Sequence, residues 1–142
     1  GRFIASSCGF YVSKIMDIKS TNDVNYCLID GGINHLNYYG QIMGMKIPPV
    51  SLVKNNADAK SENCSNFEIC GSLCTTADVI TKSLPLASPA IADFLVFKNI
   101  GAYSVTEGIY LFLSHALPCV VSYDKMEYKV LRQSFETYKI NS

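Results

Sequence analysis

The stretch that decides the fold runs from Phe67 to Asp78 and reads Phe-Glu-Ile-Cys-Gly-Ser-Leu-Cys-Thr-Thr-Ala-Asp. Its first residues alternate, with Phe67 and Ile69 on one face, which predicts a half-buried strand. Gly71 ends that strand, and a cysteine, two threonines and an aspartate follow directly after the strand end. Scaffolds often present reactive groups at such places. Composition alone favours a buried Cys74 in a β-core, because free cysteine is among the most buried residue types.

Length and charge are those of an ordinary one-domain protein. The chain has 142 residues, which suffice for one domain with a sizeable core. Twelve basic and twelve acidic side chains cancel, so the charge gives no footprint for nucleic acid or an anionic membrane. No apolar run approaches the length of a membrane span. We therefore expect neither nucleic acid nor a membrane as a partner.

The first residues and the cysteines bear on where the protein resides. Residues 1–4 lack the form of a signal peptide, and no initiator methionine precedes them, so we expect a processed or shortened product. Six cysteines allow disulfide pairing, but the chain is long enough to fold without it and nothing marks it as secreted. We expect reduced thiols and a cytoplasmic location. No Cys-x-x-Cys pair occurs, and we expect no metal site.

Short apolar runs between turn residues predict a mainly all-β fold. Five prolines and nine glycines punctuate the chain, as in sandwiches and barrels. We predict a Greek-key β-barrel or sandwich with a few short helices. Residues 9–19 form a first strand and residues 26–29 a second, joined as an antiparallel hairpin by a turn over 20–23. We expect the mostly apolar set of the first strand to face the core, namely Phe10, Val12, Lys14, Met16 and Ile18.

The remaining segments receive coarser assignments. The choice between a helix and a strand for residues 107–113 is left open. The other predictions are a loop with a helical turn over 33–45, an edge strand after the prolines of 47–53, a polar connection over 54–66, an extended loop over 79–89, a buried strand over 93–98, a hairpin of 118–123 with 127–133, and a final helix capped by Ser134.

Several short motifs follow one another in the order found in one known family. No nucleotide-binding glycine loop or nucleophile elbow is present, and each of the two histidines, at 35 and 115, is more often structural than catalytic. The motifs are Gly1-Arg2-Phe3, Asp30-Gly31-Gly32-Ile33-Asn34-His35, Gly71-Ser72-Leu73-Cys74 with Asp78, Gly101-Ala102-Tyr103, and Phe112-Leu113-Ser114-His115. Together they resemble the C-terminal half of the fold-type III pyridoxal-phosphate decarboxylases, the ornithine/diaminopimelate/arginine decarboxylase family.

This resemblance implies a domain organisation and an activity. Residues 1–142 would be the C-terminal β-domain of a two-domain enzyme whose N-terminal TIM-type barrel is absent from this chain. In that family the barrel holds pyridoxal 5'-phosphate on a lysine, and the β-domain closes the active site of a head-to-tail homodimer. The resemblance implies a lyase that decarboxylates an amino acid, with an isolated β-domain that is inactive.

The resemblance also assigns roles to three residues. Tyr103 matches the tyrosine whose hydroxyl reaches the cofactor phosphate. Arg2 matches an arginine near that phosphate or the substrate carboxylate, and a guanidinium suits either oxyanion. Cys74 matches the cysteine offered to the partner subunit's active site, where it acts as general acid toward the α-carbon after CO2 leaves. A thiol suits this task because its pKa lies close to neutral.

Three further residues are expected near the substrate. Asp78 matches an acidic position near the substrate end, and Tyr39 is expected to line the substrate channel. Thr75 follows the cysteine where diaminopimelate and ornithine enzymes carry an acidic residue for the far amino group, and residues 36–39 lack the arginine of diaminopimelate enzymes. The chain is more similar to a branch with Cys-Thr-x-x-Asp, which includes decarboxylases of carrier-bound amino acids.

Three other readings of the sequence stay open. The chain could be a non-catalytic homologue that regulates a true decarboxylase by mixed dimerisation, although it retains Cys74 and Tyr103. It could be a stand-alone β-module that binds a small ligand or peptide, and this reading predicts no exposed apolar patch. It could be a thiol hydrolase that uses Cys74, which needs His35 or His115 within hydrogen-bond reach as a base.

Overall fold

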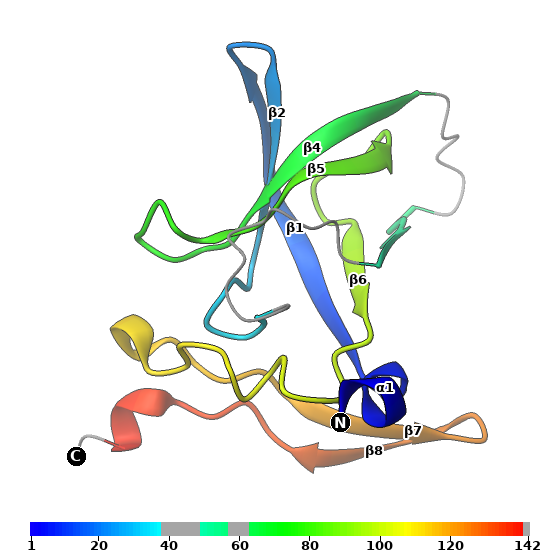
Figure 1. Ribbon diagram of the computed structural model, residues 1–142, viewed down its shortest axis with the longest axis vertical. Helices are drawn as coiled ribbons and strands as arrows, with labels where there is room; N and C mark the ends of the chain where they lie inside the picture. The colour runs from blue at the N-terminus through cyan, green and yellow to red at the C-terminus, as the bar shows by residue number, and fades with distance from the viewer. Residues whose placement is uncertain (38–48, 57–62, 141–142) are drawn as a thin grey trace. The chain divides into compact units, whose positions relative to one another are not determined.

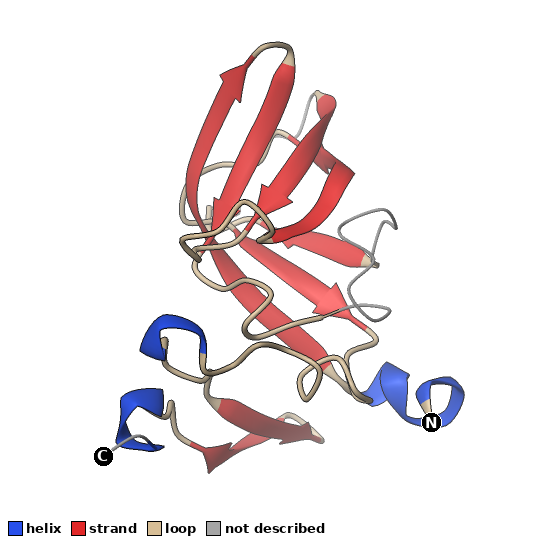
Figure 2. Cartoon of the chain, turned by 60° about the vertical axis from the view of Figure 1, so that its left-hand side comes forward, coloured by secondary structure: helices blue, strands red, loops and turns tan. Residues whose placement is uncertain are grey.

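A curled six-stranded sheet dominates the computed structural model, which describes residues 1–37, 49–56 and 63–140 (Figures 1 and 2). The sheet lies in the first of two compact units, residues 1–108. Its order is β3-β6-β1-β2-β4-β5, antiparallel throughout except for β2 and β4. The mainly all-β prediction is thus confirmed. The strands are β1 Phe10–Thr21, β2 Val24–Ile29, β3 Val50–Val53, β4 Cys64–Cys70, β5 Val79–Ala87 and β6 Phe94–Lys98.

Short helical segments occur in both units. In the first unit, α1 spans Arg2–Ala5 and η1 spans Ser6–Cys8, directly before β1. No helix of the described ranges is long and apolar enough to cross a membrane. The short helical segments confirm the prediction of a few short helices.

The second unit, residues 109–142, is built on a two-stranded hairpin of β7 (Val120–Asp124) and β8 (Glu127–Arg132), as predicted. Two 3-10 helices flank it, η2 (Phe112–Ser114) and η3 (Thr137–Ile140). Residues 107–111 form turns, so neither a strand nor a regular helix occupies the open segment. The predicted cap at Ser134 is wrong, because its hydroxyl donates to the Leu117 carbonyl at 2.9 Å.

The β1–β2 hairpin forms where the sequence predicts it. Thr21 pairs with Val24, so the turn has only two central residues. These are Asn22 and Asp23, with φ of 49° and 61°. Asn and Asp tolerate the left-handed region, and a two-residue turn of this kind matches the twist of its strands.

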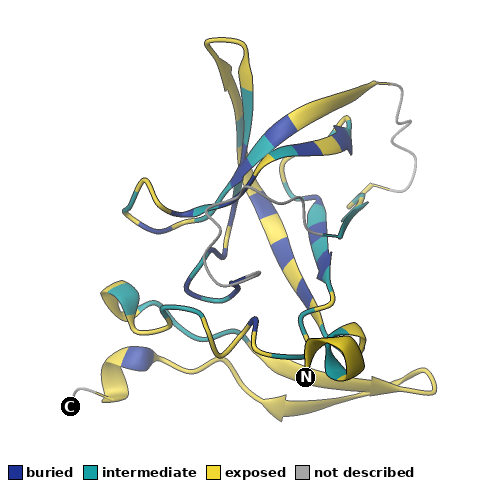
Figure 3. Cartoon of the chain, viewed as in Figure 1, coloured by how far each residue is buried: buried dark blue, intermediate teal, exposed yellow. Residues whose placement is uncertain are grey.

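The predicted core face of β1 is wrong from Phe10 to Met16. Ile18 of the same set does pack against the core, beyond a register shift between Ile15 and Asp17. Phe10, Val12 and Met16 are more than half exposed, whereas Ile15 on the other face is fully buried (Figure 3). The apolar count misleads because the buried polar groups have partners. Ser13 donates its hydroxyl to Asp30 Oδ1 at 2.5 Å, and a 2.9 Å hydrogen bond joins the hydroxyl of Tyr11 to His35 Nδ1.

Among the predictions for the other strands, some are confirmed and one is wrong. The strand expected from Phe67 is confirmed and begins earlier, at Cys64. The edge position of β3 and the strand within 93–98 are also confirmed. The loop predicted over 79–89 is wrong, because most of it is β5. β5 is an edge strand, and there Pro85 loses no ladder hydrogen bond to a further neighbour. The segment 33–45 turns at residues 33–35, and its part from 38 lies outside the described residues.

The core lies on the inner face of the curled sheet. Side chains from β1, β2, β4 and β6 meet there without exposure to solvent. The fully buried apolar members of these strands are Ile15, Cys27, Ile29, Ile69, Leu95 and Phe97. This core fixes the strand ends from which the candidate functional residues project.

A substitution pair on β1 tests which face is buried. We predict that Ile15→Ala lowers the free energy of unfolding by about 2–5 kcal/mol, because it opens a cavity in a packed core. Met16→Ala, on the exposed face, is expected to change it by no more than about 0.5 kcal/mol. Urea unfolding of the 142-residue chain, in which the exposed face of β1 is not covered by another domain, measures both. A larger cost for Met16→Ala would contradict the assigned face.

The buried carboxylate of Asp93 anchors the start of β6. It accepts hydrogen bonds from the backbone N–H groups of Asn55 and Ala90, each at 2.9 Å, and pairs with Lys54 Nζ at 3.2 Å. Burial by itself raises the pKa of Asp93, but these donors outweigh it and hold the pKa below its ordinary value.

This anchor predicts a pH dependence of stability. Because the pKa of Asp93 is lower in the folded than in the unfolded state, its ionised form stabilises the fold above the ordinary aspartate pKa. That contribution is lost as the pH falls through the folded-state pKa. We predict that Asp93→Asn costs stability at neutral pH and that the difference from wild type shrinks in acid, as measured by urea unfolding at several pH values. A difference that is constant with pH would contradict the anchor.

Candidate functional site

The loop of residues 71–78, between β4 and β5, presents Cys74 to solvent. Leu73 before it is buried and Thr75 after it is partly buried. The Thr75 N–H donates to the Leu73 carbonyl at 2.8 Å, and the Thr75 hydroxyl accepts from the Ala77 N–H at 3.3 Å. The loop is therefore a tight turn with an exposed thiol at its tip.

The carboxylate of Asp78 holds this loop to the loop after β2. Asp78 is 3% exposed. Its Oδ2 accepts from the Leu73 N–H and its Oδ1 from the Ile33 N–H, both at 2.8 Å. The backbone closes the arrangement, since the Gly71 N–H donates to the Asp78 carbonyl at 2.9 Å. One side chain thus fixes the loops that follow two neighbouring strands.

Two glycines make room for that carboxylate. A Cβ on Gly71 would lie 2.2 Å from Asp78 Oδ2, and one on Gly32 would lie 2.5 Å from the same oxygen. Real Cβ atoms do not come so close to another heavy atom, so neither position accepts a side chain without movement. The Asp-Gly-Gly and Gly-x-x-Cys motifs therefore have a shared physical cause in the packing around Asp78.

The other thiol and phenol groups near this loop are held protonated. Burial raises the pKa of Cys70 to about 11. Burial also raises the pKa of the Tyr11 hydroxyl well above its ordinary value, with smaller contributions from the carboxylates of Asp30 and Asp78. Tyr11 is bonded to His35 Nδ1, so this histidine has a structural partner. Of these groups, only the thiol of Cys74 is exposed to solvent.

Arg2 and Tyr103, the two residues assigned to the cofactor phosphate, meet in the structure although 101 positions separate them. The Arg2 guanidinium carbon lies 4.9 Å from the centre of the Tyr103 ring, in a cation–π arrangement. Tyr103 has a φ of 66°, which is rare for a residue with a side chain. Tyr103 is 49% exposed as a residue. Strain of this kind is concentrated at functional sites.

Close backbone contacts bring these two residues together. The Gly101 N–H donates to the Ser6 carbonyl at 2.9 Å, and the Ile100 N–H donates to the Gly9 carbonyl at 3.1 Å. A Cβ on Gly101 would lie 2.2 Å from the Ala5 carbonyl oxygen. The glycine of the Gly-Ala-Tyr motif thus permits the segment after β6 to lie against α1 and η1, which places Tyr103 beside Arg2.

The predicted site residues fall into two groups in the first unit. Arg2 and Tyr103 lie at the end of the sheet where β1 begins, near α1, whereas the loop of Cys74, Thr75 and Asp78 lies away from α1 (Figure 1). Tyr39 lies outside the described residues. The sequence reasoning missed Glu107, which forms an ion pair with Arg2 at 2.9 Å. No local pattern in the sequence could have found this contact, because 105 positions separate the two residues.

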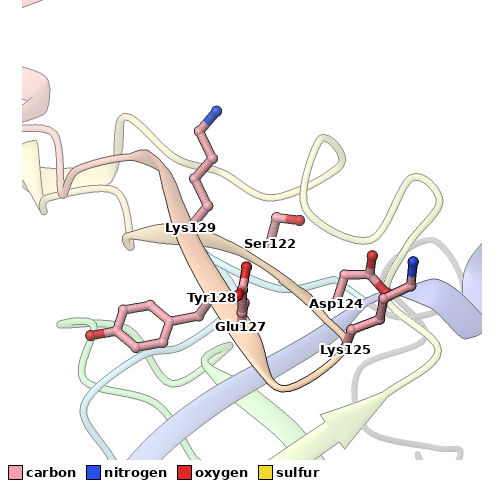
Figure 4. Close-up of a pocket in the computed structure, with 6 residues that line it drawn as sticks. All are labelled: Ser122, Asp124, Lys125, Glu127, Tyr128 and Lys129. Carbon is pink, nitrogen blue, oxygen red and sulfur yellow. The ribbon is translucent and has the colours of Figure 1, made fainter.

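The rest of the described chain offers no comparable cluster. In the described ranges, no three His, Cys, Asp or Glu side chains gather where they could hold a metal ion. A hollow on the β7–β8 hairpin has mixed charge and contains none of the predicted residues (Figure 4). It is lined by Ser122, Asp124, Lys125, Glu127, Tyr128 and Lys129.

Comparison with known proteins gives this geometry a family. Residues 2–101 match the model of the pyridoxal-dependent decarboxylase C-terminal sheet domain. The chain belongs to the pyridoxal-dependent decarboxylase family. The match begins at Arg2 and includes the Cys74 loop and Asp78, and it ends two residues before Tyr103. Members of this family pair the sheet domain with an N-terminal barrel and use pyridoxal phosphate.

Individual relatives agree with this family assignment. The chain is 32% identical over 122 residues to the diaminopimelate decarboxylase of Buchnera aphidicola subsp. Baizongia pistaciae, covering 75% of this chain and 27% of that protein. It is 23% identical to the L-glutamyl-[BtrI acyl-carrier protein] decarboxylase of Niallia circulans, covering 94% and 32%. The chain therefore spans about a third or less of these relatives.

A solved structure shows the same fold. The crystal structure of the diaminopimelate decarboxylase from Helicobacter pylori complexed with L-lysine matches 99% of this chain and 32% of that chain. The TM-score is 0.80 at 16% sequence identity. The fold of the decarboxylase sheet domain is thus retained although most of the residues differ.

The role of Asp78 in the decarboxylase sheet domain predicts the effect of a nearly isosteric change. Asp78→Asn replaces one accepting oxygen by a donor, so one of the two buried N–H groups, of Ile33 or Leu73, is left without a partner. We predict a loss of about 1–3 kcal/mol in unfolding free energy, with faster amide hydrogen exchange at Ile33 and Leu73. Asp23→Asn, at the exposed hairpin tip, is the control. Unchanged exchange at both amides would contradict the assigned role.

Proposed function

We propose that this chain is the sheet domain of a pyridoxal-phosphate-dependent amino-acid decarboxylase in which Arg2 and Tyr103 bind the cofactor phosphate and Cys74 supplies a proton in the partner subunit's active site. The observation that carries the proposal is the meeting of Arg2 and Tyr103, 4.9 Å apart, from opposite ends of the first unit's sequence. Membership of a family that uses pyridoxal phosphate supports a phosphate as the ligand of this pair, of which Arg2 lies within the matched residues 2–101.

The donors present fit a phosphate group. Arg2 offers guanidinium N–H groups and Tyr103 a phenolic O–H, and both are partly exposed. Phosphate oxygens accept from a guanidinium fork with geometric specificity as well as energy. A Cβ on Gly1 would lie 2.2 Å from the Tyr103 hydroxyl oxygen, so the backbone of the helix start also comes close to this hydroxyl.

The bound cofactor would supply the electron sink for decarboxylation. The residues of this chain orient the cofactor and the substrate, exclude water from the site and transfer a proton. The Cys74 thiol is exposed at the tip of a turn that Asp78 holds rigid from within, so it is presented outward from the domain. A proton donor must be positioned within hydrogen-bond reach of its target, and a rigid loop favours this. We propose that the target lies in the second subunit of a homodimer, because the loop between β4 and β5 that carries Cys74 lies apart from α1, which carries Arg2 (Figure 1).

The substrate that we propose is an amino acid without a free distal ammonium group, such as one linked to a carrier protein. The residue after Cys74 is Thr75, whose hydroxyl accepts from the Ala77 N–H within the loop. Asp78 has both oxygens turned to backbone N–H groups of its own domain. An unpaired ammonium beside such groups would be costly to desolvate. The similarity to the L-glutamyl-[BtrI acyl-carrier protein] decarboxylase supports this substrate class.

The exposed face of β1 favours a multidomain enzyme over a stand-alone β-module. Phe10, Val12 and Met16 are 58%, 56% and 53% exposed in the isolated chain. A stand-alone module would have little reason to keep such a row in water. We propose that the barrel domain or the partner subunit covers it. We also propose a cytoplasmic location, to which the six free cysteines of the chain are suited.

A mixing experiment with full-length variants tests the shared active site. Cys74→Ala is expected to lower kcat by about 10²–10⁴-fold, as for loss of a general acid, and Arg2→Ala to weaken cofactor binding. If Cys74 serves the partner's site, a mixed dimer of the two variants contains one site with neither defect. We predict that dissociating and mixing the two variants restores CO2 release.

The controls for this experiment are each variant mixed with itself. Either self-mixture should stay impaired, because every site then carries the same defect. Absence of restoration in subunit-exchanged dimers would place Cys74 and Arg2 in the same subunit's site. Full activity of the Cys74→Ala variant alone would remove the thiol from the chemistry and favour the regulatory homologue.

A further inference from the structure

Glu107 contacts Arg2 although none of the sequence motifs contains it. Arg2 Nη2 donates to both carboxylate oxygens of Glu107, at 3.0 and 2.9 Å. The same guanidinium lies over the ring of Tyr103. The Glu107 N–H donates to the Tyr103 carbonyl at 2.8 Å, so one turn of the chain supplies both contacts. Arg2 is thus held on two sides by groups of fixed relative position.

The turn that carries Glu107 is itself anchored to the core. The Asn37 side chain donates to the Glu107 carbonyl at 3.3 Å, and the Asn37 N–H donates to the Ser104 carbonyl at 2.8 Å. Ser104 is 2% exposed. A Cβ on Gly108 would lie 2.8 Å from the Asn34 carbonyl oxygen, so the backbones pack closely there. The carboxylate therefore projects from a rigid base.

Stability does not account for this ion pair. The side chains of Arg2 and Glu107 are 43% and 35% exposed. Pairs this exposed contribute little to folding, because water screens them and two long side chains must be ordered. Ordering Arg2 before a ligand arrives, in contrast, removes an entropic cost from binding. In the described part of the chain, Arg2 Nε and Nη1 have no hydrogen-bond partner, so the N–H groups on these atoms are available to an oxyanion.

We propose that Glu107 is a positioning residue that fixes Arg2 against Tyr103, in the orientation in which the remaining guanidinium N–H groups bind the cofactor phosphate. This inference rests on the function proposed above. Glu107 accepts from one guanidinium nitrogen and leaves the other two free. If Glu107 instead competed with the phosphate for Arg2, its negative charge would repel the phosphate. Orientation and repulsion predict opposite effects when the carboxylate is removed.

The test compares two ligands of the full-length protein after the cofactor has been removed. The dissociation constants of pyridoxal phosphate and of pyridoxal, which lacks the phosphate, are measured by absorbance or fluorescence titration. Their ratio isolates the contribution of the phosphate group from general effects on the site. We expect Glu107→Ala to lower this phosphate preference by about 2- to 10-fold, the cost of ordering one flexible side chain on binding. Glu107→Gln keeps one accepting oxygen and should lose less.

Two further variants complete the design. Asp23→Asn removes a carboxylate from the β1–β2 turn and should leave the phosphate preference unchanged, which controls for net charge. Arg2→Ala should lower the preference by about 10-fold or more, since it removes hydrogen bonds to a charged group. Glu107→Gln is nearly isosteric and decides the matter if Glu107→Ala does not fold.

The outcomes separate the inference from the function on which it rests. A preference that is unchanged or raised in the Glu107 variants, with a loss in Arg2→Ala, would overturn the positioning role and leave the phosphate site intact. An unchanged preference in Arg2→Ala would overturn the proposed phosphate site itself. A loss in Arg2→Ala with a smaller loss in the Glu107 variants supports both.

Discussion

The loops of the candidate site depend on the buried carboxylate of Asp78. Its two oxygens accept from the N–H groups of Ile33 and Leu73, and it packs against the Cα atoms of two glycines that could not carry a side chain there. A buried charge is tolerated only when hydrogen bonds compensate its desolvation. Asp78 therefore ties the end of β4 to the end of β2, and the position of the exposed Cys74 thiol follows from this tie.

A second constraint operates at the other group of site residues. The segment after β6 lies against the first residues of the chain through glycine contacts, and Tyr103 takes a left-handed conformation beside Arg2. The local strain at Tyr103 is supported by the surrounding packing. Glu107 completes this arrangement from the same turn. The two groups of site residues thus differ in burial. Asp78 is buried within the domain, whereas the side chain of Arg2 is exposed to solvent.

Much of the fold could be predicted from periodicity, and the failures have physical reasons. Alternation identified the strand with Phe67 and Ile69, and turn chemistry identified the hairpin at Asn22 and Asp23. The face of β1 was assigned wrongly because a count of apolar residues cannot foresee that Ser13 and Tyr11 have partners on the loop after β2.

The candidate site was harder to predict from the sequence than the fold. The motifs were identified by resemblance, and alternation or turn chemistry alone would not have brought Arg2 to Tyr103. The structural work of Asp78 and the contact of Glu107 depend on distances that no local pattern encodes. The most direct test is the structure of the full-length protein with pyridoxal phosphate bound. We predict that the Tyr103 hydroxyl and the Arg2 guanidinium lie within hydrogen-bond distance of the phosphate, with Cys74 reaching the second subunit's site. A phosphate bound away from both residues would contradict the account.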